Sequence, residues 1–208
     1  MGSLLTVAHR RLGAAMAVAA FLSGCIRFSV MQEDPSVGFN GGFEVARAGL
    51  PVNWFFPRIK DKGDVEISLD TLDAVEGRQS LKLVVRKVDS VRGGWAMPDL
   101  FQVRPARPGS TYRISFWRRN RGCRIRVTIR NEGKDPLFGP SDAVKKDLAA
   151  HPRIVVVLAE EETGTRTWRQ FDQAFALPQL DDHIRFELHI MEPGTLWVDD
   201  IQIQEAPL

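Results

Sequence analysis

The fold is decided by two adjacent runs of sequence, TYRISFWRR at residues 111–119 and CRIRVTIR at residues 123–130. In each run apolar and polar side chains alternate with a period of two, which is typical of a strand with one buried face. In the first run Tyr112, Ile114 and Phe116 share the apolar face. Only three residues separate the runs, so a hairpin is expected. The sequence therefore predicts a pair of neighbouring antiparallel strands.

Similar segments recur along the chain, separated by clusters of Gly, Pro, Asp and Asn. Strands are expected at residues 64–70, 79–88, 100–104, 111–119, 123–130, 153–159, 167–177, 183–190 and 195–204, with a short one at 38–44. Only residues 141–150 predict a helix, which Ser141 or Asp142 can cap. Because the strands do not alternate with helices, the sequence predicts an all-β antiparallel sandwich or barrel with one short helix.

The composition indicates one ordinary globular domain. Among 208 residues, 28 Lys and Arg balance 26 Asp and Glu, which argues against a polybasic nucleic-acid binder. Hydrophobic residues make up 44% of the chain, enough for a sizeable core. Two cysteines and four scattered histidines give neither a disulfide scaffold nor a zinc-ligand spacing. Cys123 is expected to be a half-buried small hydrophobe rather than a nucleophile.

The N-terminus reads as a targeting segment. Arginines at positions 10 and 11 precede an uncharged run at residues 12–22, too short to span a bilayer. The following LSGC resembles the bacterial lipobox, which predicts a lipoprotein signal peptide at residues 1–24 and an acylated Cys25. A plain secretory peptide with an incidental cysteine is the alternative. Residues 25–36 are expected to form a tether, and residues 37–208 a single domain.

A lipidated Cys25 would anchor the protein to a membrane without spanning it, because two or more acyl chains, palmitate among them, give stable attachment. The next residue, Ile26, is not the aspartate that retains lipoproteins at the inner membrane of enteric bacteria. An exported protein anchored to the cell envelope, on the outer membrane if the cell is Gram-negative, is therefore expected. Without residues 1–24 the chain holds 26 basic and 26 acidic residues.

Six segments, taken in order, resemble carbohydrate-binding modules of families 4, 9 and 22. The resemblance spans residues 37–205 and implies a galactose-binding-like β-jelly roll. Trp54, Trp168 and Trp197 belong to these motifs and are expected to pack in the core or against strands. The segments are NGGFE at 40–44, Trp54, GRQSLKL at 77–83, PGSTYRISFW at 108–117, Trp168 with Phe171 and Phe175, and GTLWVDDI at 194–201.

The same resemblance implies a structural calcium ion that joins the first and last strands. Its ligands would be the Gly42 carbonyl, the Glu44 side chain, carbonyls near Gly77 and Ser80, and a carboxylate oxygen of Asp199. A mixture of carboxylates and backbone carbonyls suits calcium. The alternative is that the two carboxylates cap turns or pair with arginines.

Nine arginines and no Asp, Glu or Lys lie between residues 100 and 131. If residues 111–130 form a hairpin, Arg113 and Trp117 of one strand face the same side as Arg124 and Arg126 of the next. Arginine forks match carboxylates and sulfates, and a tryptophan face stacks on sugar rings. The predicted ligand is therefore an acidic polysaccharide such as a uronate polymer, or alternatively lipopolysaccharide or cell-wall phosphates. Trp95 is a second stacking candidate. Alternatively, Glu187, Asp172 or residues 160–162 neutralise the arginines.

These observations favour a non-catalytic, lipid-anchored carbohydrate-binding module. No nucleophile elbow, phosphate loop or metalloprotease motif is present, so an enzyme is not expected. Nucleic acid is not expected as a partner either. The alternative is a structural or assembly lipoprotein of the envelope that uses the same fold to bind a protein. Residues 131–166 depart from the family pattern and could cover the arginine face.

Overall fold

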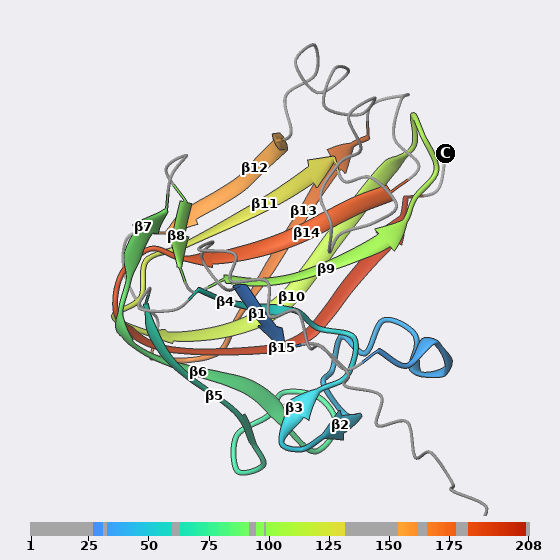
Figure 1. Cartoon of the computed structure of the whole chain (residues 1–208). Helices are drawn as coiled ribbons and strands as arrows, with labels where there is room; N and C mark the ends of the chain where they lie inside the picture. The colour runs from blue at the N-terminus through green and yellow to red at the C-terminus, as the bar shows by residue number, and fades with distance from the viewer. Residues whose placement is uncertain are drawn as a thin grey trace, which may run out of the picture.

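In a computed structural model of the chain, two antiparallel sheets pack face to face (Figure 1). The structure describes residues 27–30, 33–59, 63–91, 95–97, 99–131, 154–161, 166–177 and 183–206. One sheet has the order β13-β10-β15-β6-β5 and the other the order β12-β11-β14-β9. The strands of the first are β5 (Asp64–Asp70), β6 (Ser80–Lys87), β10 (Thr111–Arg121), β13 (Arg169–Ala176) and β15 (Gly194–Glu205). Those of the second are β9 (Asp99–Pro105), β11 (Ile125–Asn131), β12 (Ile154–Glu161) and β14 (His183–Ile190).

Three short pairs of strands accompany the sandwich. They are β1 (Arg27–Val30) with β4 (Phe56–Ile59), β2 (Ala46–Arg47) with β3 (Leu50–Pro51), and β7 (Asp89–Val91) with β8 (Trp95–Met97). Within the described part of the chain the only helix is the 3₁₀ turn η1 (Pro35–Val37), which Asp34 caps. The expected helix at 141–150 lies outside the described residues.

The period-two pattern identified the sandwich correctly, because each of the nine main strands expected from it is present. The short strand expected at 38–44 is absent. Asn40 and Phe43 have φ angles of 50° and 58°, and two left-handed residues so close together interrupt the extended backbone of a short strand. The Asn40 side chain instead accepts from the Val45 N–H and donates to the Val45 and Val52 carbonyls. This segment is a loop held by a side-chain amide.

The N-terminal part of the described chain belongs to the domain rather than to a tether. Residues 27–30 pair with β4, and the Asp34 amide donates to Asn53 Oδ1 over 2.7 Å. The tether expected at 25–36 is therefore shorter than the sequence indicated, since hydrophilic residues here bond to the domain. The signal segment and Cys25 lie outside the described residues. No described helix is long and apolar enough to cross a membrane.

The core lies between the two sheets and is rich in aromatic side chains. The Trp54 ring is fully buried, with its centroid 5.3 Å from that of Phe43 and 6.1 Å from that of Phe186. Its Nε1 donates to the Asn40 carbonyl over 2.9 Å, so the indole's polar atom is satisfied. Trp54 thus packs in the core, as expected. Truncating such a residue typically costs about 3–5 kcal/mol.

The hairpin expected between residues 119 and 123 is wrong, because β10 and β11 lie in different sheets. The chain crosses from one sheet to the other at Asn120, which is fully buried. Its side chain donates to the Cys123 carbonyl and accepts from the Cys123 N–H over 2.9 Å. The alternation of apolar and polar residues showed that each strand buries one face. It could not show to which of the two sheets each strand belongs. The connection is a corner of the sandwich.

Candidate functional site

The predicted arginine surface is divided between the two outer faces of the sandwich. Arg113 and Trp117 lie on β10, in the five-stranded sheet. Arg126 lies on β11, in the four-stranded sheet, and Arg124 immediately precedes it. Trp95 lies in β8, which contacts β14 of the four-stranded sheet. The structure therefore brings Arg124, Arg126 and the β8 strand to one side and leaves Arg113 and Trp117 on the other.

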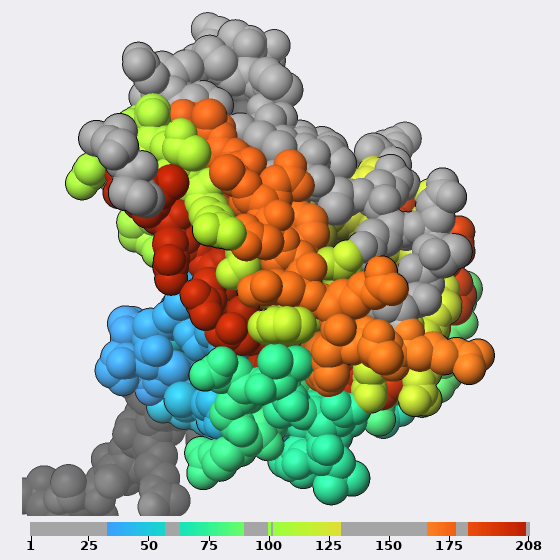
Figure 2. All heavy atoms as spheres, turned by 180° about the vertical axis from the view of Figure 1, so that it is seen from behind, coloured from blue at the N-terminus to red at the C-terminus, as the bar shows by residue number. Residues whose placement is uncertain are grey.

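On the five-stranded side, Arg113 is neutralised by a neighbouring strand. Its Nε donates to Asp172 Oδ1 over 2.6 Å, and its Nη2 pairs with Oδ2 of the same carboxylate. This fork holds the pKa of the Asp172 carboxyl below its usual value. Figure 2 looks onto this side, where the orange atoms of β13 reach the surface. The alternative that Asp172 neutralises the arginine is confirmed for Arg113.

A second arginine of this sheet, Arg119, is stacked on aromatic rings. Its guanidinium lies 4.0 Å from the Trp197 ring centroid and 5.7 Å from that of Trp168. It also pairs with Asp73, which accepts from Trp168 Nε1 over 2.7 Å. Trp197 donates to Asp70 over 2.9 Å and is only 4% exposed. Both tryptophans therefore pack against the strand, as expected, rather than offering a platform for a ligand.

On the four-stranded side, three polar residues are buried although they lie on the face turned away from the core. Thr128, Glu187 and His189 are each at most 1% exposed. Glu187 Oε2 lies 3.0 Å from His189 Nε2 and accepts from Thr128 Oγ1 over 3.3 Å, and Thr128 Oγ1 lies 3.1 Å from His189 Nε2. They form a closed triangle of contacts, which we call the polar floor.

Arginines surround the polar floor. Arg185 Nη2 pairs with Glu187 Oε1 over 2.5 Å, and Arg126 lies opposite His189 in the register of β11 and β14. Arg124 pairs with Glu192 over 3.2 Å. The Arg124 and Arg185 side chains are 32% and 13% exposed. This face therefore holds partly exposed guanidinium groups over a buried carboxylate, a geometry that can orient them toward an anion.

Sequence reasoning missed this floor, although a signal for it existed. In HIRFELHI at residues 183–190 every second residue is polar, so Arg185, Glu187 and His189 share one face of β14. The apolar residues between them, Ile184, Phe186 and Leu188, are fully buried in the core. The pattern indicated a polar face, but the pairing of β14 with β11 was needed to place it beside Arg126.

The residues expected to bind calcium meet at one loop. Glu44 Oε1 accepts from the Arg78 and Gln79 amides over 2.8 and 3.2 Å. Asp199 Oδ2 accepts from the Val75 and Glu76 amides over 2.8 and 3.0 Å. Glu44 of the first motif and Asp199 of the last strand therefore both contact the loop between β5 and β6.

The donor set at this junction does not fit calcium well, because N–H groups face the carboxylates. Asp199 Oδ1 also accepts an amide, that of Asp200, and Glu44 Oε2 lies 3.4 Å from Arg78 Nε. All four carboxylate oxygens thus have protein donors. A Cβ on Gly77 would lie 2.4 Å from Glu44 Oε1, so the loop packs closely on this carboxylate. Calcium stays a prediction here, and the contacts favour anchoring by amides.

Two further observations bear on chemistry at this domain. Burial raises the pKa of the Cys123 thiol to about 12, so this cysteine is inert, as expected. Among the described residues, no three His, Cys, Asp or Glu side chains are grouped so that they could hold a metal ion.

No family model and no curated protein matches the chain. Its fold is nevertheless that of carbohydrate-binding modules, an all-β antiparallel sandwich resembling their jelly rolls. The CBM22-1 xylan-binding domain from Paenibacillus barcinonensis Xyn10C superimposes with a TM-score of 0.53 at 14% identity, covering 81% of this chain and 93% of that domain. A CBM4 structure gives a TM-score of 0.51 at 16% identity, covering 80% of this chain and 98% of the other.

A bacteriophage structure has the same fold within a larger chain. The enzymatically active domain of tailspike protein 4 of bacteriophage CBA120 matches with a TM-score of 0.54 at 17% identity. The match covers 80% of this chain but only 21% of the tailspike chain. At these identities the likeness extends to the fold, and the chain resembles non-catalytic carbohydrate-binding modules.

Proposed function

We propose that this protein is a non-catalytic, lipid-anchored carbohydrate-binding module that takes acidic glycans on the outer face of its four-stranded sheet. The observation that carries the proposal is the buried polar floor of Thr128, Glu187 and His189 beneath partly exposed arginines. Buried charged groups are costly unless they are paired and hydrogen-bonded. A network of this kind fixes the direction of Arg185 before a ligand arrives, and pre-orientation favours recognition of a carboxylate.

The rest of the face supports the same ligand class. Arg124 and Arg126 precede and follow Ile125 at the start of β11, and β8, which carries Trp95, lies against β14. Guanidinium groups would pair with the carboxylates of a uronic-acid polymer, and the tryptophan of β8 would supply an indole for the apolar face of a sugar ring. Arginines are paired with carboxylates on both faces, Arg113 with Asp172 on one and Arg124 with Glu192 on the other. The buried polar floor, which the five-stranded side lacks among its described residues, is what favours the four-stranded side.

The test is binding of polygalacturonate, alginate and a neutral xylan, measured by calorimetry. We expect the acidic polymers to bind, and Arg126→Ala to weaken them by about tenfold, which corresponds to about 1.4 kcal/mol. Raised salt should weaken binding as well, because partly exposed charges are screened. Trp117→Ala is the matched control on the opposite sheet and should bind normally.

Two outcomes would contradict the proposal. Loss of binding in Trp117→Ala but not in Arg126→Ala would place the ligand on the five-stranded side. If none of the three polymers binds and cross-linking in cells recovers an envelope protein instead, the structural or assembly lipoprotein is the correct function.

The lipid anchor has a separate test. Expressed in a Gram-negative host, the full chain should incorporate a palmitate analogue and fractionate with the outer membrane, and Cys25→Ser should abolish both. The Cys123→Ser variant is the control, because its thiol is buried and should not be acylated. A Cys25→Ser protein that is still labelled, or a wild-type protein released into the periplasm, would support a plain secretory signal instead.

A further inference from the structure

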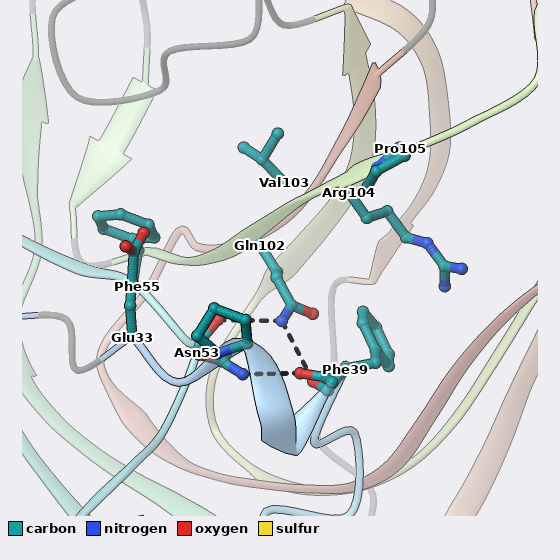
Figure 3. Close-up of a pocket in the computed structure, with 10 residues that line it drawn as sticks. Glu33, Phe39, Asn53, Phe55, Gln102, Val103, Arg104 and Pro105 are labelled. Atoms are coloured by element: carbon teal, nitrogen blue, oxygen red, sulfur yellow. Dashed lines mark hydrogen bonds between the residues drawn. The ribbon is translucent and has the colours of Figure 1, made fainter.

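A pocket of about 480 Å³ lies at the free edge of the four-stranded sheet and is lined by none of the three polar-floor residues. One wall is the edge strand β9, which supplies Gln102 and Arg104. The other wall comes from the N-terminal part of the domain, which supplies Phe39, Asn53 and further residues (Figure 3). In the register of β9 and β14, Gln102 lies opposite Phe186, a core residue, so it faces inward rather than toward the outer face.

Two side-chain amides hold the walls of this pocket in place. Asn53 accepts from the Asp34 amide and donates to the Asp34 and Gly38 carbonyls over 2.9 and 2.7 Å. Gln102 Nε2 donates to the Phe39 carbonyl over 3.2 Å and to the Asn53 carbonyl over 3.0 Å. The cavity is therefore pre-formed by cross-links between the edge strand and the N-terminal segment.

These bonds involve only the Nε2 atom of the Gln102 side-chain amide and not its oxygen, Oε1. The side chain is only 7% exposed, and within the described part of the chain its Oε1 has no hydrogen-bond partner. Its orientation is fixed, because both N–H groups of the amide point at carbonyl oxygens. Figure 3 shows Oε1 on the side of the amide that faces Arg104 and the Phe39 ring. A buried acceptor beside a cavity can accept from a water molecule or from a hydroxyl or amine group of a ligand.

Arg104 supplies a cation on the same side of the pocket. Its guanidinium lies 5.2 Å from the Phe39 ring centroid, and its Nη1 donates to the Ile203 carbonyl over 2.8 Å. No described carboxylate forms an ion pair with it. Burial without such a partner lowers the pKa of Arg104, so an added anion would be favourable. The one acidic residue that lines the pocket, Glu33, lies on the side remote from Arg104 in Figure 3.

We propose that this pocket is a second binding site, independent of the polar floor, for a single acidic sugar residue such as a uronic acid. A ring hydroxyl donates to Gln102 Oε1, the carboxylate pairs with Arg104, and the apolar face of the sugar packs on the Phe39 ring. A neutral sugar satisfies only the first and third of these contacts, and a simple carboxylate satisfies only the second.

The test is an NMR titration of the folded domain with D-glucuronate, D-glucose and acetate. We expect glucuronate to shift the amide signals of Phe39, Asn53 and Gln102 with a dissociation constant of about 1 mM, as suits a ligand of this size. Glucose should bind about tenfold more weakly, and acetate should leave the Gln102 side-chain signals unchanged. Arg104→Met should reduce glucuronate to the affinity of glucose.

Arg107→Met is the matched control, because Arg107 lies outside this pocket and pairs with Glu205. It should bind glucuronate normally. The proposal is overturned if glucuronate shifts none of the three amides of the folded protein, or if glucose binds as tightly as glucuronate. Arg126→Ala separates the two sites, because it should weaken polymer binding at the polar floor by about tenfold while leaving the glucuronate titration unchanged.

Discussion

The two outer faces of the sandwich carry their charges in opposite ways. On the five-stranded side, charged pairs such as Arg113 with Asp172 lie at the surface, and the Arg113 side chain is 66% exposed. On the four-stranded side, Glu187 is fully buried and contacts Arg185 and His189. Both faces derive from strands in which polar residues alternate with core residues. The alternation determines which side chains point away from the core. How deeply the outer face is buried then determines how much each charged side chain contributes to the free energy of unfolding.

This difference shows that the arginines between residues 100 and 131 do not form one continuous surface. Surface ion pairs contribute about 0–1 kcal/mol, whereas removing one member of a buried pair leaves a charge that water cannot reach. An exposed pair such as Arg113 with Asp172 can therefore change with little effect on folding. The buried contacts of Glu187 with Arg185 and His189 cannot.

The largest expected effect comes from Glu187→Ala. It leaves Arg185 and His189 without the buried carboxylate they contact, and we expect the free energy of unfolding to fall by about 3 kcal/mol. Asp172→Ala is the matched variant on the opposite face, where the released arginine is solvated, and it should leave stability nearly unchanged. Urea denaturation measures both. Equal losses would show that the two faces do not differ in the way described.

A smaller effect is expected from Glu44→Gln, at the junction below the five-stranded sheet. Burial raises the pKa of Glu44, but the Arg78 and Gln79 amides outweigh it and hold the pKa below the usual 4.5. The carboxylate therefore stabilises the fold above pH 4.5, and this contribution is lost as pH falls through the lower, folded-state pKa. At pH 7 we expect a loss of about 1 kcal/mol, modest because the side chain is 33% exposed.

Melting temperatures across the acid range measure this directly. The Gln variant should lose less stability than the wild type as the pH is lowered from about 5 to about 3, a range that includes the ordinary pKa of a glutamate. An unchanged slope would mean that the amides do not hold the carboxylate.

The smallest expected effect is that of a chelator. If amides anchor Glu44 and Asp199, then EDTA leaves the melting temperature unchanged, because no bound ion contributes to the folded state. Added calcium should likewise have no effect. A fall in melting temperature with EDTA that calcium reverses would establish the metal implied by the family resemblance and contradict the amide-anchored junction.

Most of the fold could be predicted from sequence because period-two alternation is local. Residues 64–70 and 183–190 were delimited correctly as strands, since each begins and ends where the alternation does. The partner of each strand is not a local property. Residues 111–119 and 123–130 have the pattern of a hairpin, yet the buried Asn120 turns the chain into the other sheet.

The candidate site was predicted only in part for the same reason. Arg124 and Arg126 stood out by charge, but Glu187 and His189 join them through the pairing of β11 with β14, more than fifty residues apart in sequence. The Gln102 pocket was not predicted at all. A single glutamine in a strand has no distinctive sequence pattern. The orientation of the Gln102 side chain depends on hydrogen bonds to the carbonyls of residues 39 and 53, which lie far away in the sequence.

The pairing of β1 with β4 has a consequence for how this protein would meet its ligand. β1 begins at Arg27, so only one residue separates it from Cys25. A lipid on Cys25 would thus be joined to a folded strand by a span of roughly 7 Å. A domain anchored in this way would not sweep a wide volume above the bilayer. It would be confined to a thin layer at the membrane surface, where it would meet a glycan attached to the same surface at high effective concentration.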